Sequence, residues 1–298
     1  MQSLNKYMIQ NEEYFLVKDY KDDDRYRLSL NKLVKKTFEF DFEEWYQQGY
    51  WSDRYQPYSL LHKDSIVANV SVNPIDFCID GQVKQVIQIG TVMTEEAYRN
   101  KGLVRILINW ILEEYEATSE FIYLYANDSV LEFYPKFGFS EAEEYSYSKL
   151  MNKNNNKTTV RKLDVQNIQD KTLINRLVSN TLPISKYSMI NNPGLVMFYL
   201  ISPLSDLIYY IEDLDLLAVV EYKENEMVLL DVFCEKEFDL DEVLCALMRK
   251  EECKITLAFT PLDSGSYQCE LWKEEGTTLF IKGKNPIIKG KLPILSHA

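Results

Sequence analysis

Two long runs of alternating residues constrain this chain most. In residues 65–79 and 83–93 apolar side chains alternate with polar ones, and the segment Asp-Gly-Gln at 80–82 separates the two runs. A period of two is typical of a strand with one buried face, and a short break that contains glycine favours a hairpin turn. The apolar residues between 103 and 111 recur instead at helical spacing. The sequence therefore predicts a hairpin followed by a helix that packs on its sheet.

Elements of both kinds surround this unit in the first half of the chain. Further strands are expected at 13–18, 121–126 and 144–150, and further helices at 22–38 and 128–137. Such an order is typical of the α/β class, with a mixed sheet and helices on its faces. A chain of 298 residues that is 46% hydrophobic can bury one large core or two ordinary ones.

One polar segment divides the chain near its middle. Residues 151–160, MNKNNNKTTV, are rich in asparagine, which favours turns over regular structure. We therefore expect a first domain at 1–150, a linker at 151–160 and a second domain at 161–298.

The second half repeats part of the first. Residues 87–108 align with residues 227–248 without a gap, with strand, turn and helix in the same places. Where the first copy reads RNKGLV, the second reads DLDEVL, so carboxylates of Asp239, Asp241 and Glu242 replace the basic residues and the glycine. Such a helix start repels anions. A duplicated fold explains the repeat, and the alternative is that any strand–turn–helix unit aligns with another.

The first copy of this helix start has the features of an anion site. Four N–H groups at the start of a helix lack partners within the helix, and the helix dipole adds a partial positive charge there. Gly102 permits a tight turn and close approach of a ligand, while Arg99 and Lys101 add charge. The sequence predicts a phosphate site here, and the competing interpretation is a solvated basic turn.

Composition narrows the class of protein. The 46 acidic and 33 basic side chains give a net charge of −13, which repels nucleic-acid backbones and anionic membranes. The five cysteines form no C-x-x-C pair, which argues against a metal cluster or a disulfide framework. No window approaches the roughly twenty apolar residues of a membrane helix, and the N-terminal segment has no signal core. We expect a cytoplasmic protein without nucleic-acid, membrane or metal partners, and a homo-oligomer remains compatible with the sequence.

With this context the chain resembles the GCN5-related N-acetyltransferase (GNAT) family over roughly residues 1–150. The segment YRNKGLV matches the family's Arg/Gln-x-x-Gly-x-Gly/Ala pattern, and FYPKFGF at 133–139 is the more specific part of the match. The resemblance implies a GNAT-like fold, tandem GNAT-like domains of which the second is degenerate, and acetyl-coenzyme A (acetyl-CoA) as cosubstrate. The implied donor-binding residues are Val92, Met93, Arg99, Asn100, Lys101, Gly102, Leu103, Val104 and Asn127.

Val104 stands where the family has a small residue. Its N–H group is still available to a phosphate, but the β-branched side chain is expected to push the phosphate outward and weaken binding. The resemblance places Tyr134 near the thioester sulfur, where a neutral phenol can protonate the departing thiolate. The alternative for Tyr134 is a ring in the core of a short helix.

The general base is not evident from the residue pattern. His62 and His297, the two histidines of the chain, are weak candidates because of their positions. A carboxylate that acts through water is favoured, and the candidates are Glu44, Asp53 and Glu132.

An aromatic segment at 40–61 provides the candidate acceptor residues. It interleaves rings such as Trp45 and Trp51 with the carboxylates of Glu44 and Asp53, and the resemblance places this region beside the acceptor. Rings with carboxylates suit a cationic amine. The equally weighted alternative is that these rings cover the sheet as core.

Three functions follow. The first is N-acetyltransfer from acetyl-CoA to the primary amine of a small, cationic acceptor, by direct attack in a ternary complex. The second is a non-catalytic sensor of acetyl-CoA or CoA, and the third is a structural pairing without a cofactor.

Overall fold

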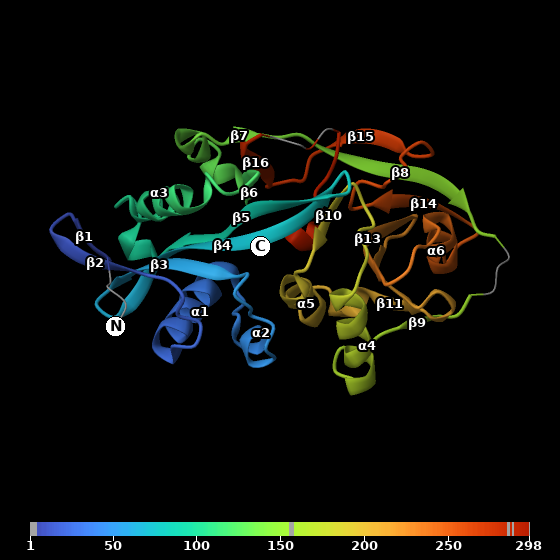
Figure 1. Cartoon of the computed structure of the whole chain (residues 1–298), viewed down its shortest axis with the longest axis horizontal. Coiled ribbons are helices and arrows are strands. Elements are labelled where there is room, and N and C mark those ends of the chain that lie inside the picture. Colours follow the sequence, from blue (N-terminus) through green and yellow to red (C-terminus); the bar gives the residue numbers. More distant parts are fainter. Residues whose placement is uncertain (1–4, 155–157, 285–286, 288, 298) are drawn as a thin grey trace.

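The computed structural model describes residues 5–154, 158–284, 287 and 289–297. Figure 1 shows its two β-sheets side by side along the long axis, with helices above and below the strands. Within the described residues, no helix combines the length and apolar composition needed to cross a membrane. The mixed α/β architecture predicted from the sequence is confirmed.

The first sheet contains the predicted hairpin. In spatial order its strands are β1 (Asn5–Ile9), β2 (Glu12–Val17), β3 (Gln56–His62), β4 (Ser65–Ile79), β5 (Gln82–Thr94), β6 (Phe121–Ala126), β16 (Thr278–Gly283) and β7 (Ser140–Glu141), and β10 (Tyr187–Ile190) pairs with β4. β4 and β5 are antiparallel, and Ile79 pairs with Gln82. The two residues between them, Asp80 and Gly81, have positive φ of 49° and 74°, as a tight primed turn requires.

Helices cover both faces of this sheet. They are α1 (Asp24–Phe38), α2 (Glu43–Gln47) and α3 (Leu103–Tyr115). Figure 1 shows α3 above strands β3 to β5, and α1 and α2 below them. Asp23 caps α1 by accepting a hydrogen bond from the Arg25 N–H. The predicted apolar face of α3 is buried through Leu103, Leu107 and Ile111.

The structure differs from the sequence prediction of a helix at 128–137. This segment consists of two 3₁₀ turns, η2 (Asp128–Val130) and η3 (Tyr134–Phe137), and a similar turn, η1 (Glu96–Tyr98), precedes α3. Pro135 lacks an N–H group and therefore fits only the first turn of a helix. Gly138, with φ of 84°, ends η3 directly afterwards, so a longer helix does not form.

The second sheet lies on the right in Figure 1. Its strands in spatial order are β15 (Gln268–Trp272), β8 (Glu144–Asn152), β14 (Glu252–Leu257), β13 (Glu226–Cys234), β12 (Leu216–Tyr222), β11 (Ile208–Ile211) and β9 (Val160–Lys162). The helical segments of this half are α4 (Ile168–Ser179), α5 (Pro193–Ile201), α6 (Leu240–Leu247), η4 (Ser205–Leu207), η5 (Glu212–Leu214) and η6 (Ile294–Ser296).

The repeated unit predicted from the sequence is present in both sheets as strand, turn and helix. β5, α3 and β6 form one unit, in which β5 and β6 are parallel. β13, α6 and β14 form the other, and β13 and β14 are also parallel. In each sheet the strand before the unit pairs antiparallel with its first strand. The two halves therefore share this local arrangement.

The two sheets exchange strands. β16, from the C-terminal half, pairs with β6 in the first sheet, whereas β8, from the N-terminal half, pairs with β14 in the second. A shared hydrophobic core joins the halves, and in it the indole N–H of Trp45 donates to the carbonyl of Gly194 at 2.8 Å. Part of the predicted linker, residues 155–157, lies outside the described residues. The predicted domain limits stay a prediction. Each half of the chain contributes a strand to the sheet of the other half, so the two sheets do not coincide with the two predicted domains.

Candidate active site

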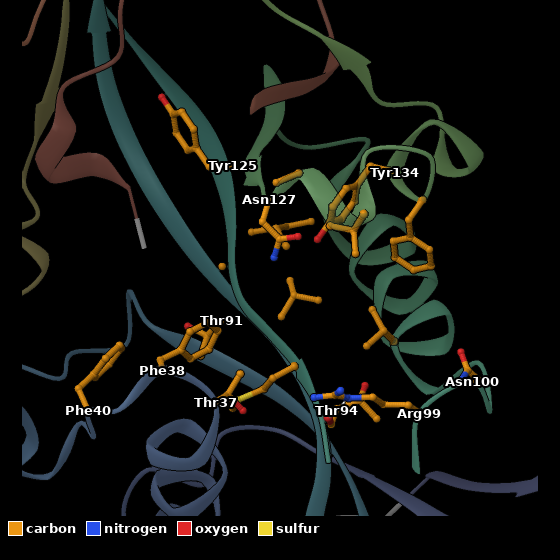
Figure 2. Close-up of a pocket in the computed structure, with 18 residues that line it drawn as sticks. Thr37, Phe38, Phe40, Thr91, Thr94, Arg99, Asn100, Tyr125, Asn127 and Tyr134 are labelled. Carbon is orange, nitrogen blue, oxygen red and sulfur yellow. Dashed lines mark hydrogen bonds between the residues drawn. The ribbon is translucent and has the colours of Figure 1, made fainter. Parts of the chain in front are cut away.

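A cavity of about 600 Å³ opens where two parallel strands separate. β5 and β6 pair only from Ile87 to Ile89, although β5 continues to Thr94 and β6 to Ala126. Beyond Ile89, no strand among the described residues pairs with the β6-facing edge of β5. Figure 2 shows the residues that line this cavity. The separation therefore leaves backbone groups of β5 free to bind an extended ligand.

A β-bulge in β5 accompanies this separation. Thr91, which lines the cavity, has a left-handed φ of 48°, and two residues of β5 lie opposite one residue of β4 at this point. Buried side chains hold this conformation. Asn69 Nδ2 donates to the Thr91 carbonyl at 3.0 Å and to Ser71 Oγ at 2.9 Å, and the hydroxyl of Tyr55 donates to Thr91 Oγ1 at 3.2 Å. Ser59 Oγ donates to Asn69 Oδ1 at 2.7 Å. The bulge thus has a fully buried polar support.

The start of α3 closes one end of the cavity. Gly102 is the N-cap of the helix with φ of 77°, and it offers no side chain to the first-turn N–H groups. The first turn also contains no acidic residue. Arg99, Asn100 and Val104 line the cavity here, and Asn100 has a positive φ of 63°. Uncapped N–H groups beside an arginine make an anion site of this helix start.

Two predicted donor-site residues direct their side chains elsewhere. Lys101 Nζ donates to Glu12 Oε2 at 2.9 Å and lies 5.0 Å from the centroid of the Tyr98 ring. This ion pair lowers the pKa of the Glu12 carboxyl. Leu103 is buried in the core below α3. The structure therefore does not bring either side chain into the cavity.

The equivalent start of α6 has the opposite character. Asp239 is its N-cap, and Asp239 Oδ1 accepts a hydrogen bond from the Asp241 N–H at 2.9 Å. Asp241 and Glu242 add negative charge to the first turn. An N-terminus capped by its own carboxylate has little capacity to bind phosphate. This contrast with α3 supports the difference that the sequence predicts between the two copies.

Asn127 and Tyr134 face the cavity from the segment after β6. Asn127 Oδ1 accepts a hydrogen bond from the Ser129 N–H at 3.1 Å, which leaves its amide nitrogen directed into the cavity (Figure 2). The Tyr134 hydroxyl also points into the cavity (Figure 2). Val92 and Met93 line the same space from β5. The structure thus brings together seven of the predicted residues: Val92, Met93, Arg99, Asn100, Val104, Asn127 and Tyr134.

The environment of Tyr134 keeps its phenol protonated. Its ring is buried against Phe133, Phe139 and Phe280, with centroids 5.3, 6.2 and 5.9 Å away. Within the described part of the chain, no group hydrogen-bonds its hydroxyl. Burial raises the pKa of Tyr134 to about 12. A buried, neutral phenol can donate a proton to a ligand in the cavity. Because Phe280 belongs to β16, the exchanged strand supports this residue.

The candidate acceptor tryptophans lie in the core. Trp45 and Trp51 are each 4% exposed and stack with centroids 5.8 Å apart. Both indole N–H groups donate to backbone carbonyls, and that of Trp51 donates to the Tyr55 carbonyl at 3.0 Å. Neither ring lines the cavity. Of the two interpretations of the aromatic segment, the structure favours hydrophobic core for these two rings.

The candidate carboxylates also lie outside the cavity. Asp53 pairs with Lys21 at 2.5 Å, and Glu44 accepts a hydrogen bond from Gln48 at 2.9 Å. Glu132 is exposed. Among the described residues that line the cavity there is no aspartate, glutamate or histidine. The structure therefore does not place any of the predicted base candidates against the reacting groups.

Two residues that we did not single out from the sequence line the cavity instead. Phe38 is the last residue of α1 and Phe40 lies just beyond its C-cap, and both form the side of the cavity opposite Arg99 and Tyr134 (Figure 2). Their signal in the sequence is one aromatic residue at the end of the periodic helix pattern and another two positions later. That pattern does not reveal which way the chain turns at Glu39, which has a left-handed φ of 68°.

Comparison with known proteins identifies the fold. Residues 20–142 match the family described as Acetyltransferase (GNAT) domain. These residues form a GNAT acetyltransferase domain. The protein is an acetyl-CoA-dependent acetyltransferase of the GNAT type, and the matched residues of the GNAT domain include β3 to β6, α3 and Tyr134.

The likeness of the fold to solved structures extends over both sheets of the chain. A GCN5-related N-acetyltransferase from Kribbella flavida is 14% identical, with a TM-score of 0.55 over 90% of this chain and 71% of its own. One from Anabaena variabilis ATCC 29413 is also 14% identical, with a TM-score of 0.55 over 89% and 72%. A Probable N-Acyltransferase from Enterococcus faecalis V583 is 12% identical, with a TM-score of 0.58 over 90% and 72%. At these identities the likeness shows the fold. No curated protein matches the sequence.

Proposed function

We propose that the protein transfers an acetyl group from acetyl-CoA to the primary amine of a small acceptor in this cavity. The amine attacks the thioester directly while both substrates are bound. The observation that carries this proposal is the joint presence of an uncapped helix start and a buried phenol in one cavity. Acetyl-CoA supplies the acetyl group as a reactive thioester. The cationic character of the acceptor stays a prediction, because its expected carboxylates lie elsewhere.

Donor binding uses the end of the cavity at α3. The first-turn N–H groups after Gly102 would hold the diphosphate, and Arg99 would add a charge-assisted contact. The free edge of β5 at Val92 and Met93 would pair with the extended arm of the donor. A backbone N–H of the same edge is suited to stabilise negative charge on the thioester oxygen.

Proton transfer uses Tyr134. Its hydroxyl faces the cavity and its raised pKa keeps it protonated at neutral pH, so it can protonate the thiolate that leaves. The described lining residues include no side chain of the usual base types. We therefore propose that the proton of the attacking amine leaves through water. The buried cavity assists this loss, since desolvation favours the neutral form of an amine.

The C-terminal half is proposed to be a degenerate GNAT-like domain without a diphosphate loop. The parallel arrangement of β13, α6 and β14 and the carboxylate cap of α6 support this proposal. It predicts one donor molecule per chain. Calorimetric titration with acetyl-CoA measures this number, and a second equivalent that persists in Gly102→Asp would contradict it.

Two experiments test the transfer itself. Acetyl-CoA at a hundredfold its Kd should stabilise the fold by about 2.7 kcal/mol, and Gly102→Asp should abolish this stabilisation by placing a carboxylate at the phosphate position. Thiol release with a panel of primary amines should then detect turnover. Tyr134→Phe should lower kcat while the Kd for acetyl-CoA is unchanged. Equal rates for the two proteins would remove Tyr134 from the mechanism.

The alternative function is a sensor that binds acetyl-CoA or CoA without chemistry. The absence of a base side chain from the described cavity lining is the observation that favours it. Stabilisation by acetyl-CoA without thiol release for any amine of the panel would support the sensor.

A further inference from the structure

The end of helix α1 gives the cavity an aromatic wall. The Glu39 N–H donates to the Lys35 carbonyl and Glu39 adopts a left-handed conformation, which ends the helix between two phenylalanines. Phe38 and Phe40 then stack with centroids 6.1 Å apart and an interplanar angle of 26°. They remain 42% and 38% exposed although they line the cavity. Their rings therefore offer uncovered apolar surface to whatever enters.

The core holds this wall in place. The Phe40 ring lies 5.4 Å from the ring of Phe42 and 5.7 Å from that of Phe198, which belongs to helix α5. Phe42 in turn packs against Trp45 and Trp51. An aromatic surface held by such contacts is preorganised for a ligand, so a ligand loses little affinity to reorganisation of the wall.

The charge of the cavity disfavours a polycationic acceptor. Arg99 is the charged side chain among the described lining residues, and no carboxylate accompanies it. The lining is otherwise apolar or uncharged, with Ile89 and Met93 near the point where the strands separate. A polycation that entered would lose hydration without gaining an opposite charge. A single amine on an apolar body would lose much less.

We infer that the acceptor carries its amine on an aromatic or other apolar body, which packs against Phe38 and Phe40. This inference rests on the proposed acetyl transfer and names the substrate class for it. The aromatic wall lies across the cavity from Tyr134 and Arg99 (Figure 2). An acceptor body on the wall would leave its amine directed toward the donor side. Offset aromatic contacts and the burial of ring surface supply the binding energy.

The test compares primary amines that carry an aromatic, an aliphatic or a polycationic group. With acetyl-CoA as donor, kcat/KM is measured for 2-phenylethylamine, hexylamine and spermidine. We expect 2-phenylethylamine to exceed spermidine at least tenfold. The double variant Phe38→Ala/Phe40→Ala should lower kcat/KM at least tenfold for the first two amines and less than twofold for spermidine, with an unchanged KM for acetyl-CoA. A variant with leucine at both positions should retain activity on hexylamine.

Leu28→Ala is the matched control, since Leu28 is an exposed apolar residue of the same helix and does not line the cavity. It should leave all three amines unaffected. A preference for spermidine, or an equal loss for all amines in the double variant, overturns the inference.

A binding measurement separates the inference from the proposed transfer. If no amine is acetylated, the transfer proposal fails, and calorimetry of 2-phenylethylamine with the CoA-bound protein decides the acceptor class alone. Binding that weakens at least tenfold in the double variant supports the aromatic wall. Absence of binding, or equal binding to both proteins, overturns it.

Discussion

Asn69 offers the sharpest test of how the cavity is held open. Its side chain is fully buried and makes three hydrogen bonds, to the Thr91 carbonyl, Ser71 Oγ and Ser59 Oγ. Asn69→Ala removes all three and leaves the Thr91 carbonyl of the bulge without this partner. The two serines keep other partners, Tyr55 and a further tyrosine of the first half. The loss is therefore concentrated at the bulge.

The expected loss of stability in Asn69→Ala follows from these contacts. A buried carbonyl left unsatisfied costs about 1–3 kcal/mol, and each of the two further hydrogen bonds contributes about 0.5–1.5 kcal/mol. We expect a total destabilisation of about 4 kcal/mol. For a chain of this length that unfolds as one unit, this corresponds to a fall in Tm of about 6 °C. Because the bulge positions Val92 and Met93, we also expect the affinity for acetyl-CoA to fall about tenfold.

Asn73→Ala is the matched control. Asn73 is buried on the same strand and donates to Gln88 Oε1 at 2.6 Å, but it does not line the cavity or touch the bulge. It should lower Tm by about 3 °C, since it removes one buried hydrogen bond worth about 2 kcal/mol, while the affinity for acetyl-CoA stays within twofold. Calorimetry below the transition temperature measures both variants in the folded state. If Asn69→Ala keeps normal donor affinity, or loses no more stability than an exposed substitution, the assigned role of the bulge is wrong.

Three further predictions concern the donor site. Val104→Ala should preserve or tighten binding of acetyl-CoA, because it removes the branched side chain beside the proposed phosphate; weaker binding in calorimetry would contradict this. Arg99→Ala should weaken binding about tenfold by removing a charge-assisted contact, whereas Lys101→Ala, which loses a contact to Glu12 outside the cavity, should change it less than twofold. Burial raises the pKa of Tyr134 to about 12, so the phenol stays protonated as the pH rises past the usual value near 10; kcat should show no loss from this group up to about pH 10, and a fall near pH 9 that disappears in Tyr134→Phe would refute it.

Much of the first sheet was predictable because its signals are local. The alternation at 65–79 and the Asp80–Gly81 break act within the hairpin itself, and the structure confirms both strands and the turn. The helix at 103–115 was predictable for the same reason, since its apolar spacing needs no distant partner to be recognised. The prediction of a helix at 128–137 was wrong, because one proline and one glycine restrict this segment to 3₁₀ turns.

The candidate site was predictable only in part. A helix start is read from neighbouring residues, and Arg99, Asn100 and Val104 do line the cavity. The direction of the Lys101 side chain was not readable, because its partner Glu12 lies 89 positions away in the sequence. The same holds for Trp45 and Trp51, whose aromatic character fits an acceptor site and a core equally well until their neighbours are known.

By itself, the sequence determined the hairpin, the apolar face of α3, the uncapped start of this helix and its carboxylate-capped counterpart at α6. These features depend on the conformational preferences of residues close together in the chain. Only the tertiary structure decided that β16 and β8 exchange between the sheets and that Phe280 supports Tyr134. It also decided that Phe38 and Phe40, rather than the tryptophans, line the cavity. The physical reason is that contacts between distant segments depend on how the whole core packs. The alternation of apolar and polar residues indicates which face of a strand is buried, but it does not specify which strand lies beside it.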